Sequence, residues 1–284
     1  MSDALVIAGH ALREAVRRRV LLVVALLTAV FRGLVALAAF EAFDSLERTP
    51  AGGIPIDEQA LAGGTLLGLA MFVALFLGVV LAVFLTLDAV RGDAERGLLQ
   101  PLVVRPVGRT TLLAGRLLAA SAVGATSVGA VFLLAVLITH QAGDFTPSSL
   151  VVPAAGLALG VVTVVAVSLL GTTVLSTTAN GIAVFMVFAT GLAAGLLGQI
   201  GEGLEVDSLE TASSIISWIV PFEALYLNGL HALTSDIGGP AGVIVQLGPF
   251  GGANDTSGAI WMWAVGWSAA VLALAALAFG RRDL

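Results

Sequence analysis

The side chains in this sequence that could perform acid–base or metal chemistry are few and scattered. Its three histidines are His10, His140 and His231. His140 is followed four residues later by Asp144, and His231 five residues later by Asp236, so each pair offers one nitrogen and one oxygen to a divalent cation. An isolated pair of this kind in a polar loop is more typical of solvated side chains than of a metal site. We therefore predict no metal centre.

Two residue types that carry covalent or phosphate chemistry are missing from the sequence. The chain has no cysteine, which excludes disulfides, thiolate metal sites and a cysteine nucleophile. It also has no lysine, which excludes Schiff-base chemistry and the phosphate-binding lysine of a Walker A motif. Neither kind of chemistry is available to this chain. We also predict no catalytic residues, no cofactor bound by this chain and no nucleic-acid partner. If ATP powers the protein, ATP and Mg²⁺ bind to another chain.

The composition places the protein in a lipid bilayer. Hydrophobic residues make up 58% of the 284 positions and charged residues only 11%, a balance that soluble domains do not have. A chain of this length has room for about six helical spans of about 20 residues with their connections. The sequence therefore predicts an all-α integral membrane protein, with a single domain over residues 1–284.

Apolar runs define six predicted spans. Before the first of them, Leu5, Ala8, Leu12 and Val16 recur at helical spacing, which predicts an amphipathic helix over 3–17 in the cytoplasmic interface. A cleaved signal peptide is disfavoured, because the first run is too long and no small-residue cleavage site follows it. The predicted spans are at about 20–40, 61–87, 111–139, 151–175, 181–200 and 260–279.

The placement of arginine predicts the orientation of these spans. With both termini in the cytoplasm, eleven of the thirteen arginines and six of the nineteen acidic residues lie on the inner side. The net charge of −6 then divides into +5 inside and −11 at or beyond the outer face. Because positive residues concentrate on the cytoplasmic side of membrane proteins, we predict that both the N-terminus and the C-terminus are cytoplasmic.

A long polar segment separates the second and third spans. Residues 88–116 carry five of the thirteen arginines. Within the segment, residues 95–104 predict a short amphipathic helix, which is compatible with Pro101 only if this proline lies in the first turn. The apolar side of this helix either rests on the membrane or on its own bundle, or it docks into a groove on a cytoplasmic partner and carries rigid-body motion into the two spans.

This segment resembles the motif between the second and third spans of ABC-2 type transporter permeases. That motif is commonly E-R-x-x-G-T-L-E-x-L-L-x-x-P-V-S-R, followed by G-K/R-L-L. Allowing one or two residues of difference in the first spacing, the matching residues are Glu95, Gly97, Leu99, Pro106, Val107, Arg109, Gly115, Arg116 and Leu117. Leu98 replaces the usual threonine, and Pro101 is unusual. The run RPVGR is particularly similar to permeases linked to the maturation of nitrous-oxide reductase, a copper enzyme, and to sodium or drug export.

The resemblance implies the permease subunit of an ATP-binding-cassette exporter, in the plasma membrane of a prokaryote. It implies a separate ABC ATPase, in two copies, that docks on the coupling region 88–110, and a second permease subunit that is identical or related. Closure of the ATPase pair on ATP would then rock the two bundles. The residues expected to contact the ATPase are Glu95, Arg96, Gly97, Leu98, Leu99, Leu102, Arg105, Pro106 and Arg109.

The outer segment before the last span, residues 201–258, contains one apolar island at 215–233. The resemblance implies short helices that re-enter the membrane from the outer face, with Pro221 and the pair Asn228–Gly229 as breakers. A helix lying flat on the outer interface is the alternative. A seventh span is disfavoured, because Pro221 and Glu223 interrupt the island and the C-terminal arginines would then lie outside.

Arg32 is the one basic residue inside a predicted span. An arginine buried in a membrane costs about 3 kcal/mol or more, so its presence needs a reason. It lies eight residues before Phe40, about 12 Å from the outer end of the span, and its side chain could extend towards Glu41 or Asp44. A role in the substrate path or in a dimer interface is the alternative.

Glycines spaced four residues apart occur in several spans and let helices approach closely. They fit either packing within one chain or a two-fold dimer of permeases. The pairs are Gly64 with Gly68, Gly156 with Gly160 and Gly191 with Gly195.

Two other classes of function are alternatives to an exporter. A secondary transporter or a membrane scaffold would act without an ATPase; such a transporter needs acidic residues within its spans for ion coupling, and the second to sixth predicted spans contain none. An intramembrane protease needs a serine with a histidine, or two aspartates, inside the spans, and all three histidines lie outside them. The exporter is the interpretation we adopt, with no substrate indicated.

Overall fold

The structure is a computed structural model, and it describes residues 7–9, 12–13, 19–48, 57–87, 108–238 and 258–281. The predicted coupling helix at 95–104 and most of the predicted interfacial helix over 3–17 lie outside these residues. The described part is helical, with no strand in it. This confirms the all-α class.

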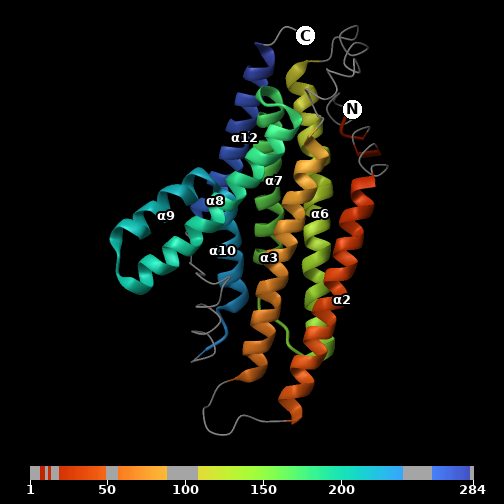
Figure 1. The fold of residues 1–284 in the computed structure, drawn as a ribbon, viewed down its shortest axis with the longest axis vertical. Helices are drawn as coiled ribbons and strands as arrows, with labels where there is room; N and C mark the ends of the chain where they lie inside the picture. Colours follow the sequence, from red (N-terminus) through yellow and green to blue (C-terminus); the bar gives the residue numbers. More distant parts are fainter. Residues whose placement is uncertain are drawn as a thin grey trace.

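Six helices in the described ranges hold a segment long and apolar enough to cross a membrane, which confirms the predicted number of spans. The segments are Leu22–Leu46, Glu58–Thr86, Thr110–Gly143, Val151–Val174, Thr177–Leu204 and Ala259–Gly280. The helices that contain them are α2 (Arg19–Arg48), α3 (Glu58–Thr86), α6 (Arg109–Gly143), α7 (Val151–Val174), α8 (Thr177–Leu204) and α12 (Ala259–Gly280) (Figure 1). Two shorter helices, α9 (Asp207–Ile219) and α10 (Pro221–Thr234), follow α8.

Several helices extend beyond the apolar runs that predicted them. α6, for example, has 35 residues, or about 52 Å at 1.5 Å per residue, against about 30 Å of hydrocarbon. Local polar groups set the ends. Asp57 accepts a hydrogen bond from the Ala60 backbone N–H at 2.9 Å where α3 begins, and Asp144 adopts a left-handed conformation with φ 52° where α6 ends. Helix boundaries therefore follow caps rather than the limits of hydrophobicity.

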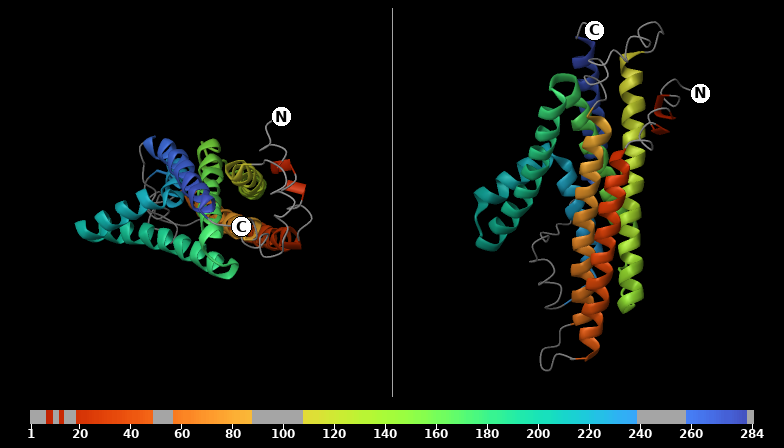
Figure 2. Two further views of the ribbon diagram at one scale, coloured as in Figure 1. Left: turned by 90° about the horizontal axis from the view of Figure 1, so that it is seen from above. Right: turned by 45° about the vertical axis from the view of Figure 1, so that its right-hand side comes forward.

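α3 and α7 form the centre of the bundle (Figures 1 and 2). α2 packs against α3 and α6 on one side, and α12 packs against α7 and α6. The main core is apolar and close-packed, with side chains from α3, α6 and α7 among its largest buried members. These include Leu67, Met71, Leu75, Phe132 and Leu157. α8 and α9 lie side by side and project away from this bundle (Figure 2).

Two of the three predicted glycine pairs face α10 of the same chain. A Cβ on Gly156 would lie 2.8 Å from the Leu225 carbonyl oxygen, and Gly160 lies against the backbone of Phe222. On α8, Gly191 packs on the Phe222 ring and Gly195 on the Glu223 carboxyl group. These glycines therefore serve packing within the chain, because a Cβ at Gly156, Gly191 or Gly195 would overlap atoms of α10.

We predict that Gly156→Ala lowers the midpoint of thermal unfolding by several degrees. The added methyl group meets a backbone oxygen that cannot rotate away, and overpacking of this kind costs about 1–3 kcal/mol. The measurement is the fraction of monodisperse protein left after heating in detergent, by size-exclusion chromatography. Gly266→Ala on α12 is the control, because nothing lies within 4 Å of a Cβ there. Equal midpoints for the two variants would contradict the packing described here.

Candidate functional site: the α9–α10 hairpin

α10 enters the bundle beside α7, whereas α9 packs along α8 and away from the bundle (Figure 1). α10 runs antiparallel to α7, since Phe222 lies at Gly160 and Gly229 lies at Pro153. Gly160 is the tenth residue of α7, about 14 Å along the helix from its first residue. The junction between α9 and α10 therefore lies near the middle of α7. Whether the hairpin re-enters the membrane or lies on its outer interface stays a prediction.

The hairpin differs from its predicted bounds. It begins at Asp207 and ends at Thr234, whereas the apolar island predicted 215–233. The sequence could not show the early start, because α9 has polar residues in its first two turns. Pro221 is the first residue of α10, a position where a helix needs no N–H from it.

The expectation that Asn228–Gly229 breaks the helix was wrong, because both residues lie inside α10. A Cβ on Gly229 would lie 3.1 Å from the Pro153 Cα and 3.2 Å from the Met71 Cε. A glycine is needed there because α10 passes close to α7 and α3. In the sequence, a glycine needed for close packing cannot be distinguished from one that marks a turn.

Two tryptophans join the hairpin to the last span. The Trp263 indole N–H donates a hydrogen bond to the Trp218 carbonyl oxygen at 2.9 Å. The two rings meet edge to face, with 5.6 Å between their centroids, a favoured geometry for aromatic pairs. α12 thereby holds the end of α9 in place.

Glu223 is the buried acidic residue of this hairpin, with 2% of its surface exposed. Its Oε2 accepts a hydrogen bond from the Ser217 hydroxyl at 2.8 Å. Its Oε1 has no hydrogen-bond partner among the described residues, and it lies against Gly195. Burial raises the pKa of Glu223 to about 7, against the smaller lowering by the Ser217 hydrogen bond. Glu223 belongs to α10, which is outside the six spans.

Tyr226 lies one turn further along α10 and is also buried. Its hydroxyl has no hydrogen-bond partner in the part of the chain that is described, and burial raises its pKa. The sequence singled out Glu223 only as an obstacle to a seventh span. Neither Ser217 nor Tyr226 carried a signal, because their importance arises from the turn that folds α9 onto α10.

A second polar cluster joins three helices at the opposite end of the bundle, near the coupling region. The hydroxyls of Thr86 on α3 and Ser168 on α7 lie 2.6 Å apart. The Asn180 side-chain amide on α8 donates to the Ser168 carbonyl oxygen at 3.1 Å. Gly171 leaves the space that the Asn180 side chain fills. All three polar side chains are buried, so they tie α3, α7 and α8 together.

Most of the residues predicted to contact an ATPase lie outside the described ranges. They are Glu95, Arg96, Gly97, Leu98, Leu99, Leu102, Arg105 and Pro106. Arg109 is the first residue of α6, and its side chain is not among those described. The structure does describe the two helix ends that flank this segment, Thr86 on α3 and Arg109 on α6. Their contribution to docking stays a prediction.

Arg32 and the histidine pairs lie apart from the hairpin junction. Arg32 is half-buried on α2, and its Nε has no hydrogen-bond partner among the described residues. His140 Nδ1 lies 3.2 Å from Asp144 Oδ1 at the exposed end of α6. Within the described ranges, no three His, Cys, Asp or Glu side chains come together as metal ligands would.

We predict that the stability of the protein falls as the pH rises from about 5 to about 8. The folded protein binds the Glu223 proton more tightly than the unfolded chain does, because its pKa is raised from 4.5 to about 7. The stabilisation is complete below the unfolded pKa and is lost as the pH rises through about 7. The free energy of unfolding lost over this range is about 3 kcal/mol. The measurement is the unfolding midpoint in detergent as a function of pH.

Glu223→Gln should remove this dependence, since the amide keeps the shape of the acid and does not titrate. Glu205→Gln, at an exposed position, is the control and should follow the wild type. If the unfolding midpoint of Glu223→Gln changes with pH as steeply as that of the wild type, the effect does not come from this residue.

Comparison with known proteins gives a family for the whole chain. The sequence profile described as "ABC-2 family transporter protein" matches residues 5–284. No curated protein sequence matches the chain. The matched range includes all six spans, the hairpin with Glu223 and the segment between α3 and α6. The chain therefore belongs to the ABC-2 family of membrane transporter proteins.

Proposed function

We propose that this chain is the permease subunit of an ATP-binding-cassette exporter and that a separate ATPase chain drives it. The observation that carries the proposal is the family match over residues 5–284 of a chain without lysine. A transporter of the ATP-binding-cassette class needs a Walker A lysine for ATP. Since this chain has none, the nucleotide binds to a partner.

The coupling region 88–110 is the part of the chain that would receive the ATPase. It connects the inner ends of α3 and α6, and α3 lies at the centre of the bundle. The contact between Thr86 and Ser168, together with the hydrogen bond from Asn180, joins α3 to α7 and α8. A displacement of the coupling region would therefore move three helices together rather than one.

The proposed oligomer is a two-fold dimer of permeases. Its support is the symmetry that a path between two bundles requires and the apolar surface that α2 leaves exposed. Two permeases around a two-fold axis, each with one ATPase, would form a path between bundles. Large apolar side chains of α2, among them Leu22, Leu26, Leu34 and Leu37, are exposed in the single chain. Such a surface suits contact with lipid or with a second permease. The membrane would be the plasma membrane of a prokaryote, with both termini in the cytoplasm.

A secondary transporter is the second candidate, and Glu223 is the observation that favours it. A buried carboxyl group that titrates near neutral pH could carry a proton. A transporter of that class would move its substrate on a pH gradient in vesicles that contain this chain and no ATPase. An exporter would need the ATPase and ATP.

We predict that an ABC ATPase co-purifies with the tagged wild-type protein in mild detergent and is lost from Glu95→Arg and Leu99→Asp. The first change reverses a charge, and the second places a charge on the apolar side of the predicted coupling helix. The measurement is the ATPase to permease ratio after affinity purification, with monodispersity of the permease checked in each case. We expect at least a tenfold reduction, since interface hot spots cost about 2 kcal/mol or more.

Asp236→Arg is the matched control, because it reverses an exposed charge after α10, on the predicted outer side. It should keep the ATPase. If no ATPase is recovered with the wild type, or if the coupling variants keep it, then the exporter assignment fails and the secondary transporter becomes the better interpretation.

A further inference from the structure

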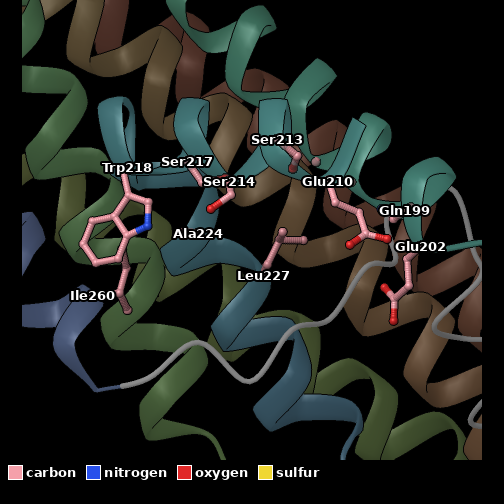
Figure 3. Close-up of a pocket in the computed structure, with 12 residues that line it drawn as sticks. Gln199, Glu202, Glu210, Ser213, Ser214, Ser217, Trp218, Ala224, Leu227 and Ile260 are labelled. Carbon is pink, nitrogen blue, oxygen red and sulfur yellow. The ribbon is translucent and has the colours of Figure 1, made fainter. Parts of the chain in front are cut away.

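A cavity of about 380 Å³ lies between α8, α9 and α10, beside the start of α12 (Figure 3). Its size is that of a site for a compact organic molecule. The coupling mechanism proposed above makes no use of it. The side chains around it change in character from one end to the other, and this gradient indicates what the cavity could hold.

One end of the cavity is acidic. Figure 3 shows Glu202 of α8 and Glu210 of α9 together with Gln199 at this end. Both carboxylates are exposed, and neither has an ion-pair or hydrogen-bond partner among the described residues. None of the described residues that line the cavity is an arginine or a histidine. Two like charges without a counter-ion repel each other, so this end attracts a cation.

The fold itself brings these two acids together. α8 ends where Glu205 adopts a left-handed conformation with φ 53°, and the Val206 backbone N–H donates to the Gly201 carbonyl oxygen at 2.8 Å. The chain then reverses, so that Gly201 packs against the backbone of Glu210 and Gly198 against Ser213. The close approach of α8 and α9 at these glycines places the acids on neighbouring helices.

The other end of the cavity is apolar and aromatic. Trp218 of α9 and Ile260 of α12 line it, at the end opposite the acids in Figure 3, and Leu227 of α10 lies between the two ends. Trp218 is eight residues after Glu210 on the same helix, about 12 Å away. A ligand that spans the cavity would therefore place a charged group and an apolar body about this far apart.

A buried polar group stands behind the wall between the two ends. The Glu223 Oε2 accepts a hydrogen bond from Ser217. The Glu223 Oε1 has no hydrogen-bond partner among the described residues and lies against Gly195. Both Ser217 and Gly195 line the cavity. The unpartnered Oε1 of a side chain that is only 2% exposed is thus directed at the cavity wall.

We propose that this cavity binds an amphipathic organic cation, with its positive group at Glu202 and Glu210 and its apolar body against Trp218, Leu227 and Ile260. A bare metal ion does not suit the site, because no three ligating side chains converge within the described part. A free cation gains attraction from both carboxylates, whereas the phosphate of a zwitterionic lipid headgroup offsets part of the attraction of its ammonium group, so the ligand of this proposal is a free cation. Trp218 adds attraction for a cation that lies deeper in the site.

The experiment measures equilibrium binding of tetraphenylphosphonium to the purified full chain, by dialysis in a non-ionic detergent without ATPase or ATP. Tetraphenylborate has the same shape and the opposite charge, so it reports partition into the detergent. We expect saturable binding of the cation alone. Replacing both exposed acids, by Glu202→Gln with Glu210→Gln, should weaken it about tenfold. Added phosphatidylcholine should not displace the probe.

Two variants locate the site. Glu205→Gln makes the same chemical change at an exposed acid that does not line the cavity, and it should bind as the wild type does. Ser214→Trp fills the cavity from an exposed position, and it should abolish saturable binding without changing the unfolding midpoint.

The proposal is overturned if the borate binds as the phosphonium does, if phosphatidylcholine displaces the probe, or if the double Gln variant or Ser214→Trp keeps wild-type affinity. Because the assay contains no ATPase, a failure here leaves the exporter proposal standing. Likewise, failure to recover an ATPase would not affect the binding result.

Discussion

The close contact between the backbones of α10 and α7 is the constraint on which the hairpin depends. At Gly156 there is no room for a methyl group beside the Leu225 carbonyl oxygen. This contact sets the position of α10 along α7, and that position determines where Glu223 and Ser217 meet. It also sets the position of α9, which continues from the other side of Pro221. The cavity between α8 and α9 is therefore a consequence of a helix that packs without side chains between the two backbones.

The sequence predicted the spans well and the hairpin incompletely. Long apolar runs identify a helix in lipid because every backbone polar group must be satisfied internally, so all six spans were found. Their ends were not, because caps such as Asp57 and Asp144 act through single hydrogen bonds or a single left-handed residue. The pair Asn228–Gly229 was misinterpreted, since a glycine needed for close packing and a glycine needed for a turn have the same appearance in one sequence.

The candidate site was harder to predict than the fold for a related reason. Ser217 and Glu223 are six residues apart and come together only because the chain turns at Val220. Thr86, Ser168 and Asn180 are far apart in sequence and belong to three helices. Periodicity reports which face of one helix is apolar, and it says nothing of which polar side chains from different helices meet. The resemblance to ABC-2 permeases directed attention to the coupling region, whereas the polar groups of the described structure meet at the hairpin junction near the middle of α7.

The hydrogen bond from Trp263 to the Trp218 carbonyl oxygen has a consequence for how the protein is made. Helices α3, α7 and α8, which surround α10, all precede it in the chain, so they are synthesised and available before the hairpin arrives. α12 comes last, and it brings the indole that holds the end of α9. Any packing of the hairpin against these helices before α12 is made therefore occurs without this contact. The hairpin reaches its final set of contacts only when the last span has left the ribosome.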